Sequence, residues 1–149
     1  MEPIKSTMRV EYMVLANGAE AVEGHHYIIG GGFEAIFAPA LPATHPRLSV
    51  ALKVCVPYEA TSRGHKLGLE LHDQDGHGVG DPFEAQFESG RPPGMRAGDH
   101  HSLIIAFNFL NIQFTEYGTY SVVCLLDGSE EGRSTFRVTQ ATPAAGASR

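Results

Sequence analysis

The sequence predicts an all-β protein, an antiparallel β-sandwich of about eight strands. Apolar and polar residues alternate along nearly the whole chain, and helical periodicity is almost absent. Gly, Pro, Asn or Asp bounds each alternating run, as expected of strands joined by turns. Strands of a parallel sheet are apolar on both faces, so this one-sided alternation favours antiparallel pairing.

Three segments carry the clearest alternation. Residues 48–56 place an aliphatic side chain at every second position, and residues 66–72 and 83–88 repeat the pattern. We expect each to be a strand with one solvated face. Asp75-Gly76 and Asp127-Gly128 fall between strand runs, where the positive φ that Gly permits favours a tight hairpin.

The other strand candidates are less regular. They are residues 10–16, 26–31, 33–37, 102–110, 120–126 and 133–138. Because Gly30-Gly31-Gly32 offers no side chains to pack, we expect residues 26–37 to form one bent strand or two short ones. Residues 102–110 are apolar on both faces, which predicts a central strand or a strand that another segment covers.

A chain of 149 residues is expected to form one domain. We place this domain at residues 8–139, between a loose N-terminus (1–7) and a flexible C-terminal tail (140–149), since neither end has apolar periodicity. Residues 88–99 are rich in Gly and Pro, which break a strand ladder, so they are predicted to form a long loop across one end of the domain.

Charge and composition narrow the classes of partner. The chain has 11 Lys and Arg against 17 Asp and Glu, a net charge of −6, which argues against nucleic acid as the main partner. No apolar stretch approaches the roughly 20 residues of a membrane-spanning helix, and the N-terminus lacks the apolar core of a signal peptide. We therefore expect a cytoplasmic protein with neither a nucleic-acid nor a membrane partner.

One local pattern indicates the type of sandwich. The segment Glu116-Tyr117-Gly118-Thr119-Tyr120 matches the approach to a late strand of immunoglobulin-like sandwiches, where the Tyr hydroxyl bonds back to the nearby backbone. We therefore predict a tyrosine corner at Tyr120. Antibody domains have a Cys two residues later, whereas this chain has Val122, so the pattern favours an immunoglobulin-like sandwich over a true immunoglobulin domain.

Four segments carry a resemblance to a known kind of protein. They are Val10-Glu11-Tyr12-Met13-Val14-Leu15-Ala16, Ile28-Ile29-Gly30-Gly31-Gly32-Phe33, Val56-Pro57-Tyr58-Glu59 and Gly90-Arg91-Pro92-Pro93-Gly94. Over residues 8–139 the chain resembles an uncharacterised bacterial family of short all-β proteins with an immunoglobulin-like sandwich and unknown function. The resemblance implies a bacterial, cytoplasmic, stand-alone sandwich and transfers no catalytic residue.

Residues 73–84 have the spacing of a calcium-binding loop, with acidic residues at its positions 1, 3, 9 and 12 and Gly78 at position 6. The flanking segments alternate with a period of two instead of forming helices, and His77 replaces the usual oxygen ligand. We interpret the segment as a Gly-rich hairpin with solvated acids. The alternative is a metal site whose ligands are Asp73, Asp75, Asp81 and Glu84.

The histidines and cysteines give no clear site. Adjacent residues on a strand point to opposite faces, so neither His25-His26 nor His100-His101 can hold one ion alone, although histidines from separate strands could still converge. Cys124 shares a face with core residues, whereas Cys55 lies opposite the apolar stripe of residues 48–56. We therefore predict two free thiols, and we expect no cofactor.

Loops supply the candidate binding residues, which are Tyr58, Glu59, Arg63 and Arg91. In the alternative reading, the two arginines tie loop carbonyls or pair with Glu59 or Glu88. The Gly-x-Ser-x-Gly, Cys-x-x-Cys and phosphate-loop motifs are absent from the sequence. We therefore predict a non-enzymatic binding or assembly module with a protein partner or self-association. The alternative is a small-ligand-binding protein or an enzyme with a His/acid site that could depend on a metal.

Overall fold

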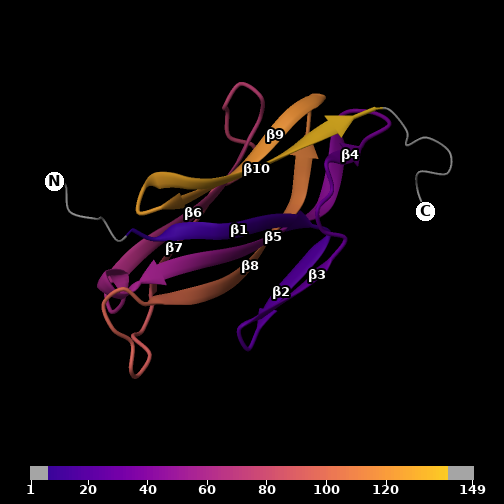
Figure 1. Cartoon of the computed structure of the whole chain (residues 1–149). Coiled ribbons are helices and arrows are strands. Elements are labelled where there is room, and N and C mark those ends of the chain that lie inside the picture. Colours follow the sequence, from indigo (N-terminus) through magenta and orange to yellow (C-terminus); the bar gives the residue numbers. More distant parts are fainter. Residues whose placement is uncertain (1–6, 141–149) are drawn as a thin grey trace.

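The computed structural model describes residues 7–140 as ten β-strands and one short 3-10 helix, so the predicted all-β class is confirmed (Figure 1). The strands are β1 (Arg9–Ala16), β2 (Gly18–Val22), β3 (His25–Ile29), β4 (Ala35–Phe37), β5 (Ala43–Pro57), β6 (Gly64–His72), β7 (Phe83–Glu88), β8 (His100–Phe114), β9 (Gly118–Leu126) and β10 (Ser129–Thr139), and the helix is η1 (Tyr58–Ala60). They form a three-stranded sheet (β1-β5-β8), a five-stranded sheet (β4-β10-β9-β6-β7) and a two-stranded sheet (β2-β3).

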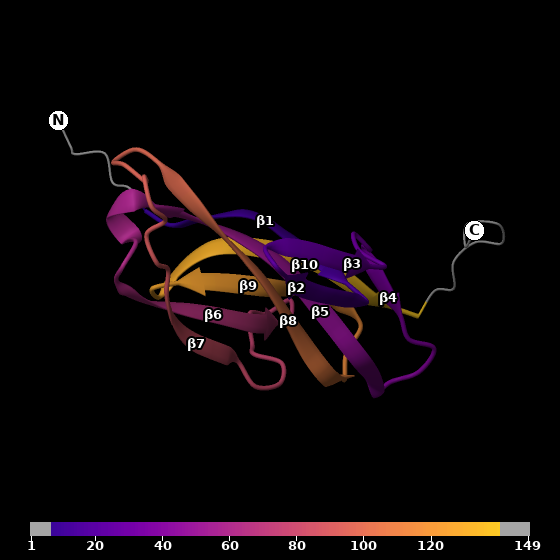
Figure 2. The same ribbon diagram turned by 90° about the horizontal axis from the view of Figure 1, so that it is seen from below.

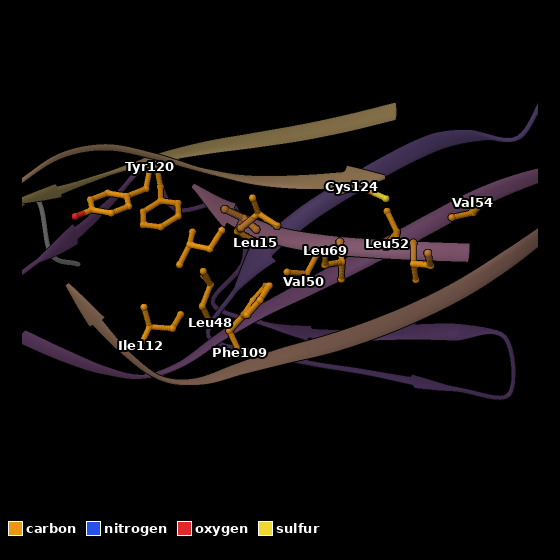
Figure 3. Packing of buried hydrophobic residues seen from close by; sticks show 14 of the residues in the cluster. Leu15, Leu48, Val50, Leu52, Val54, Leu69, Phe109, Ile112, Tyr120 and Cys124 are labelled. Atoms are coloured by element: carbon orange, nitrogen blue, oxygen red, sulfur yellow. The ribbon is translucent and has the colours of Figure 1, made fainter. Parts of the chain in front are cut away.

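The apolar core lies between the three-stranded and the five-stranded sheets, and Figure 3 shows its side chains gathered between their ribbons. The alternating residues of β5, which are Leu48, Val50, Leu52, Val54 and Val56, are all fully buried. Leu69 of β6 and Val122 of β9 contribute to this core from the five-stranded sheet. At one end, the rings of Tyr120 and Phe136 stack with centroids 5.8 Å apart, and Phe114 meets both rings edge-on. The period-two pattern of residues 48–56 therefore identified the central element of the core.

Both predicted antiparallel neighbours are confirmed, because β6 pairs with β7 and β9 pairs with β10. Asp127 and Gly128 form the tight β9–β10 turn with φ of 50° and 86°, a conformation that suits Gly and Asp. Asp75-Gly76, in contrast, sits inside a longer β6–β7 connection. That connection is held by its own backbone bonds, such as the one from Asp73 N–H to His77 O at 2.9 Å.

Two features depart from the predicted antiparallel sandwich of about eight strands. β4 pairs with β10 in parallel, and the chain reaches β4 in the five-stranded sheet from β3 of the two-stranded sheet. Residues 26–37 form two short strands, and the first of these, β3, pairs with β2, which the sequence did not predict. The segment Gly18–Ala21 contains only small residues and one Glu, so it gave no alternating apolar signal.

The β2–β3 hairpin explains why residues 102–110 are apolar on both faces. β8 is the outer strand of the three-stranded sheet, so the expectation of a central strand is wrong. The hairpin packs against β5 and β8, and Figure 2 shows it lying across these two strands. The alternative, a strand covered by another segment, is confirmed.

The long loop predicted at residues 88–99 lies between β7 and β8, whose bounds leave 89–99 outside any strand. The predicted loose termini fall almost wholly outside the described residues. Across residues 7–140, no helix has the length and apolar character required to span a membrane.

The predicted tyrosine corner is confirmed at the start of β9. The buried Tyr120 hydroxyl donates a hydrogen bond to the backbone carbonyl of Glu116 at 2.6 Å. Burial of the phenol raises the pKa of Tyr120, so the hydroxyl keeps its proton and acts as a donor at neutral pH. This bond fixes the chain where it enters β9.

We expect the substitution Tyr120→Phe to lower the free energy of unfolding by about 1–2 kcal/mol, because it leaves the Glu116 carbonyl without its donor. Urea unfolding followed by circular dichroism measures the loss. Tyr27→Phe is the matched control, since Tyr27 is 59% exposed and its unfolding should match the wild type. Equal stability of the two variants would show that the corner contributes nothing.

Candidate functional site

Two of the four predicted loop residues, Tyr58 and Arg91, lie in contact. The Arg91 guanidinium carbon is 3.8 Å from the centre of the Tyr58 ring. Its Nε donates to Thr61 Oγ1 at 2.8 Å and its Nη2 donates to the Tyr58 carbonyl at 3.3 Å. Arg91 thus ties η1 to the 89–99 loop, as the alternative structural reading of this residue predicted.

The other two, Glu59 and Arg63, are exposed, and no hydrogen bond or ion pair among the described residues joins them to the Tyr58–Arg91 contact. Arg63 instead lines a hollow of about 220 Å³, together with His65 and Asp127. The four predicted residues therefore do not form one site.

His65 and Asp127 form a pair at this hollow that sequence reasoning missed. His65 is 9% exposed, and its Nδ1 lies 2.8 Å from Asp127 Oδ2. Its Nε2 lies 2.7 Å from the Ala60 carbonyl, which can only accept, so Nε2 carries a proton. Both ring nitrogens are thus held by the protein, and the pair cross-links β6 to the β9–β10 turn and to η1. Neither nitrogen is free to act as a base or a metal ligand.

Asp127 is held in its ionised form by its hydrogen bonds. Partial burial raises the pKa of its carboxyl, but the Lys66 backbone N–H and the His65 ring outweigh that effect and leave the pKa below its usual value. A carboxyl with a lowered folded-state pKa stabilises the fold above its unfolded pKa of about 3.9. That stabilisation is lost as the pH falls through the folded-state value.

We expect Asp127→Asn to reduce the free energy of unfolding at pH 7, because Asn supplies no charge to His65. The difference from the wild type should be smaller at about pH 3, because the pH is then below the unfolded pKa of about 3.9 and approaches the lowered folded-state pKa, where Asp127 takes up its proton. Urea unfolding at the two pH values measures it, with Asp81→Asn as the exposed control. A difference of the same size at both pH values would contradict this account.

The calcium-like segment brings together only part of the alternative metal set. Among the described residues, the one group of three or more candidate ligands is Asp73, Asp75 and His77, whose ligand atoms lie within 4.8 Å of one another. Asp73 Oδ1 accepts the backbone N–H groups of Asp75 and His77, both at 2.9 Å. The N–H of His77, above all, lowers the pKa of Asp73. The structure places Asp81 and Glu84 outside this group, and Glu84 faces Lys66 at 3.9 Å.

Both cysteines are buried free thiols, as predicted. Cys124 belongs to the core between the sheets, where burial raises the pKa of its thiol to about 11. Cys55 is buried outside that core, on the opposite face of β5 from its apolar stripe. With its raised pKa, the Cys124 thiol is protonated at neutral pH and unreactive.

The most exposed apolar surface is the outer face of the β2–β3 hairpin. Opposite residues share a face, and the pairs Gly18–Ile29, Glu20–Tyr27 and Val22–His25 alternate with pairs that face the three-stranded sheet. On the outer face Val22, Tyr27 and Ile29 are 45%, 59% and 73% exposed. We call these three side chains the hairpin patch.

His26 fixes the hairpin to two strands of the three-stranded sheet. Its Nε2 donates to the carbonyl of Ile105 on β8 at 2.8 Å, and the Tyr12 hydroxyl of β1 lies 2.7 Å from its Nδ1. The rings of Tyr12 and His26 also meet edge-on at 5.5 Å. Because His26 and its partners come from three different strands, the sequence alone gave no sign of this contact.

Residues 11–139 match the model of a protein family, DUF6941, which is described as a family of unknown function. The chain belongs to DUF6941. This match confirms the predicted resemblance to a family of unknown function. No curated protein matches this DUF6941 chain.

Among solved structures, this DUF6941 chain is similar to the Pseudomonas fluorescens alkylpurine DNA glycosylase AlkC bound to DNA containing an abasic site analog. The TM-score is 0.51 at 12% sequence identity. The match covers 88% of this chain but only 30% of the glycosylase chain. At this identity the likeness concerns the fold alone.

Proposed function

We propose that this DUF6941 protein is a non-enzymatic binding module that docks onto another protein through the hairpin patch. The observation that carries the proposal is the exposure of Val22, Tyr27 and Ile29 on one face of a two-stranded hairpin. Exposed apolar clusters with an aromatic residue are typical of protein interfaces, where a few such side chains supply most of the binding energy.

The way the hairpin is held supports this function. His26 bonds the hairpin to β8, and Ala19 is buried against the sheet beneath. The inner face of the hairpin therefore packs within the protein, and the outer face is the one that a partner can reach. A hairpin fixed in this way loses little conformational entropy when a partner binds, which favours affinity. Its outer face is small compared with the roughly 800 Å² per partner of a standard interface. The partner must therefore also contact surface beyond the three side chains of the hairpin patch.

We infer that the two larger sheets form an immunoglobulin-like sandwich. The tyrosine corner at Tyr120 and the core between two face-to-face sheets support this assignment. The buried free thiols of Cys55 and Cys124 support a reducing compartment such as the cytoplasm.

The geometry gives less support to the other classes of function. The His65–Asp127 pair, which resembles an acid–base pair, has both imidazole nitrogens engaged in structural bonds. The AlkC structure contains DNA, but a net charge of −6 on this chain disfavours a phosphate backbone as its own partner. Protein docking is the function that the exposed residues favour.

Site-specific photo-crosslinking in the native host tests the proposal. A benzoylphenylalanine in place of Tyr27 should give adducts with a protein, because the patch lies in the interface. The substitution Ile29→Lys in the same chain should abolish these adducts by placing a charge among the contacts. The control is the same photo-reactive residue in place of Glu59, which is exposed but remote from the hairpin in sequence.

Adducts that form equally at positions 27 and 59, or that survive Ile29→Lys, would contradict docking through the hairpin patch. Adducts between two copies of this chain would show self-association in place of a different partner.

A further inference from the structure

The two larger sheets are joined on one side and open on the other. On the β1–β10 side, Ser134 Oγ donates to the Met13 carbonyl at 3.0 Å and Gly132 packs closely against Val10. On the other side, β7 and β8 are the outermost strands of their sheets (Figure 2). Within residues 7–140, no further strand pairs with the free edge of β7.

An apolar groove of about 260 Å³ runs between these two outer strands. Phe83, Ala85 and Phe87 of β7 line one wall and are half-buried, whereas Leu103 and Ile105 of β8 line the other. The ring of Phe83 stacks on Phe107 with centroids 4.1 Å apart, which joins the two strands near the start of β7. Ala85 is the smallest side chain of its wall, so the hollow lies at the middle of the strand.

The groove suits a peptide segment better than a small molecule. Its volume is below the roughly 300–1,000 Å³ of pockets that enclose drug-sized ligands. It also lies beside an unpaired strand edge, which offers backbone N–H and carbonyl groups. Main-chain hydrogen bonds to an edge, with alternate side chains in pockets, are the means by which extended peptides add to a sheet. We propose that β7 binds an extended segment of another protein as an additional strand, whose apolar side chains enter the groove.

The charges on β7 indicate the composition of this segment. Glu84 and Gln86 alternate with the groove residues and are exposed on the opposite face of the strand, whereas the exposed Glu88, at the end of β7, borders the groove itself. Opposite charges on neighbouring strands stabilise their pairing and like charges weaken it. The segment that fits β7 therefore alternates apolar residues with Lys or Arg.

The same charges exclude a second copy of this chain as the occupant. In an antiparallel pair of two β7 strands, opposite residues share a face, so Phe83, Ala85 and Phe87 of one copy must share a face with the same three residues of the other. Two registers satisfy this condition and keep most of the strand paired. One register places Glu84 opposite Glu88 twice, which is repulsive. The other brings Pro82 into the ladder opposite Glu88, where it has no N–H to donate. This surface is distinct from the hairpin patch and does not depend on it.

Peptide titration of the full-length, ¹⁵N-labelled chain tests the proposal. The probe is a capped peptide of about eight residues that alternates Val and Lys, a length that covers β7, and the comparison peptide alternates Val and Glu. Up to about 2 mM peptide, we expect the Val–Lys probe to shift amide signals of β7 and of residues 103–107 in β8. The Val–Glu peptide should bind much more weakly.

Four variants make the test specific. The double substitution Glu84→Lys and Glu88→Lys should weaken binding of the Val–Lys peptide about tenfold and reverse the preference of the two peptides. Ala85→Leu should abolish binding of either peptide, because it fills the hollow without changing charge. Glu20→Lys, an exposed charge reversal on β2, and Ile29→Lys in the hairpin patch should leave the titration unchanged.

Equal affinity for the two peptides would overturn the proposal, as would shifts away from β7 and β8 or no shifts at all. Dimerisation of the chain through β7 would replace the proposed partner with a second copy. Because Ile29→Lys should leave the titration unchanged, a failure here is separate from a failure of the hairpin patch.

Discussion

The arrangement of the outer surface depends on one side chain, His26. Its imidazole accepts a hydrogen bond from Tyr12 of β1 and donates one to the Ile105 carbonyl of β8, while its backbone belongs to β3. A half-buried ring with both nitrogens satisfied by two other strands holds the hairpin in a single position. Without the His26 bonds, the hairpin would be held less firmly over the apolar outer face of β8, which includes Ile104 and Ala106.

The hairpin has two faces with different roles. Its inner face, where Ala19 is buried and His26 is bonded, completes the cover of the three-stranded sheet. Its outer face presents Tyr27 and Ile29 to solvent, because no other sheet among the described residues covers that face of the hairpin. The groove on the β7–β8 side follows from the same small number of strands. The two larger sheets are bonded to each other along β1 and β10, whereas on the other side the Phe83–Phe107 ring contact joins β7 and β8 and leaves a groove beside it. Both candidate surfaces thus follow from how the sheets are covered and closed.

Much of the fold could be predicted from local sequence. The alternation of residues 48–56, the Asp127-Gly128 turn and the approach to Tyr120 each depend on neighbours close in the chain. The β2–β3 pairing could not, because Gly18–Ala21 has no large apolar side chain that would mark one face of a strand. The parallel β4–β10 pair joins segments about a hundred residues apart, a separation that turn signals do not reach.

The candidate surfaces were less predictable than the fold. Tyr58 and Arg91 were identified as loop residues, but their contact with each other is structural. Tyr27 and Ile29 have strand periodicity, which is typical of a core face, and only the pairing with β2 shows that their face points outward. The groove on β7 depends on β8 lying opposite, which no local pattern reports.

The most direct test of this account is amide hydrogen exchange of the full-length chain with His26→Ala, compared with His25→Ala. His25 is the adjacent, exposed residue, so its loss should leave exchange unchanged. The account predicts that His26→Ala speeds exchange roughly tenfold in residues 18–29 while the amides of β5 and β9 keep their protection. Equal exchange of the hairpin in the two variants would contradict the central claim that His26 holds the hairpin and its exposed patch in place.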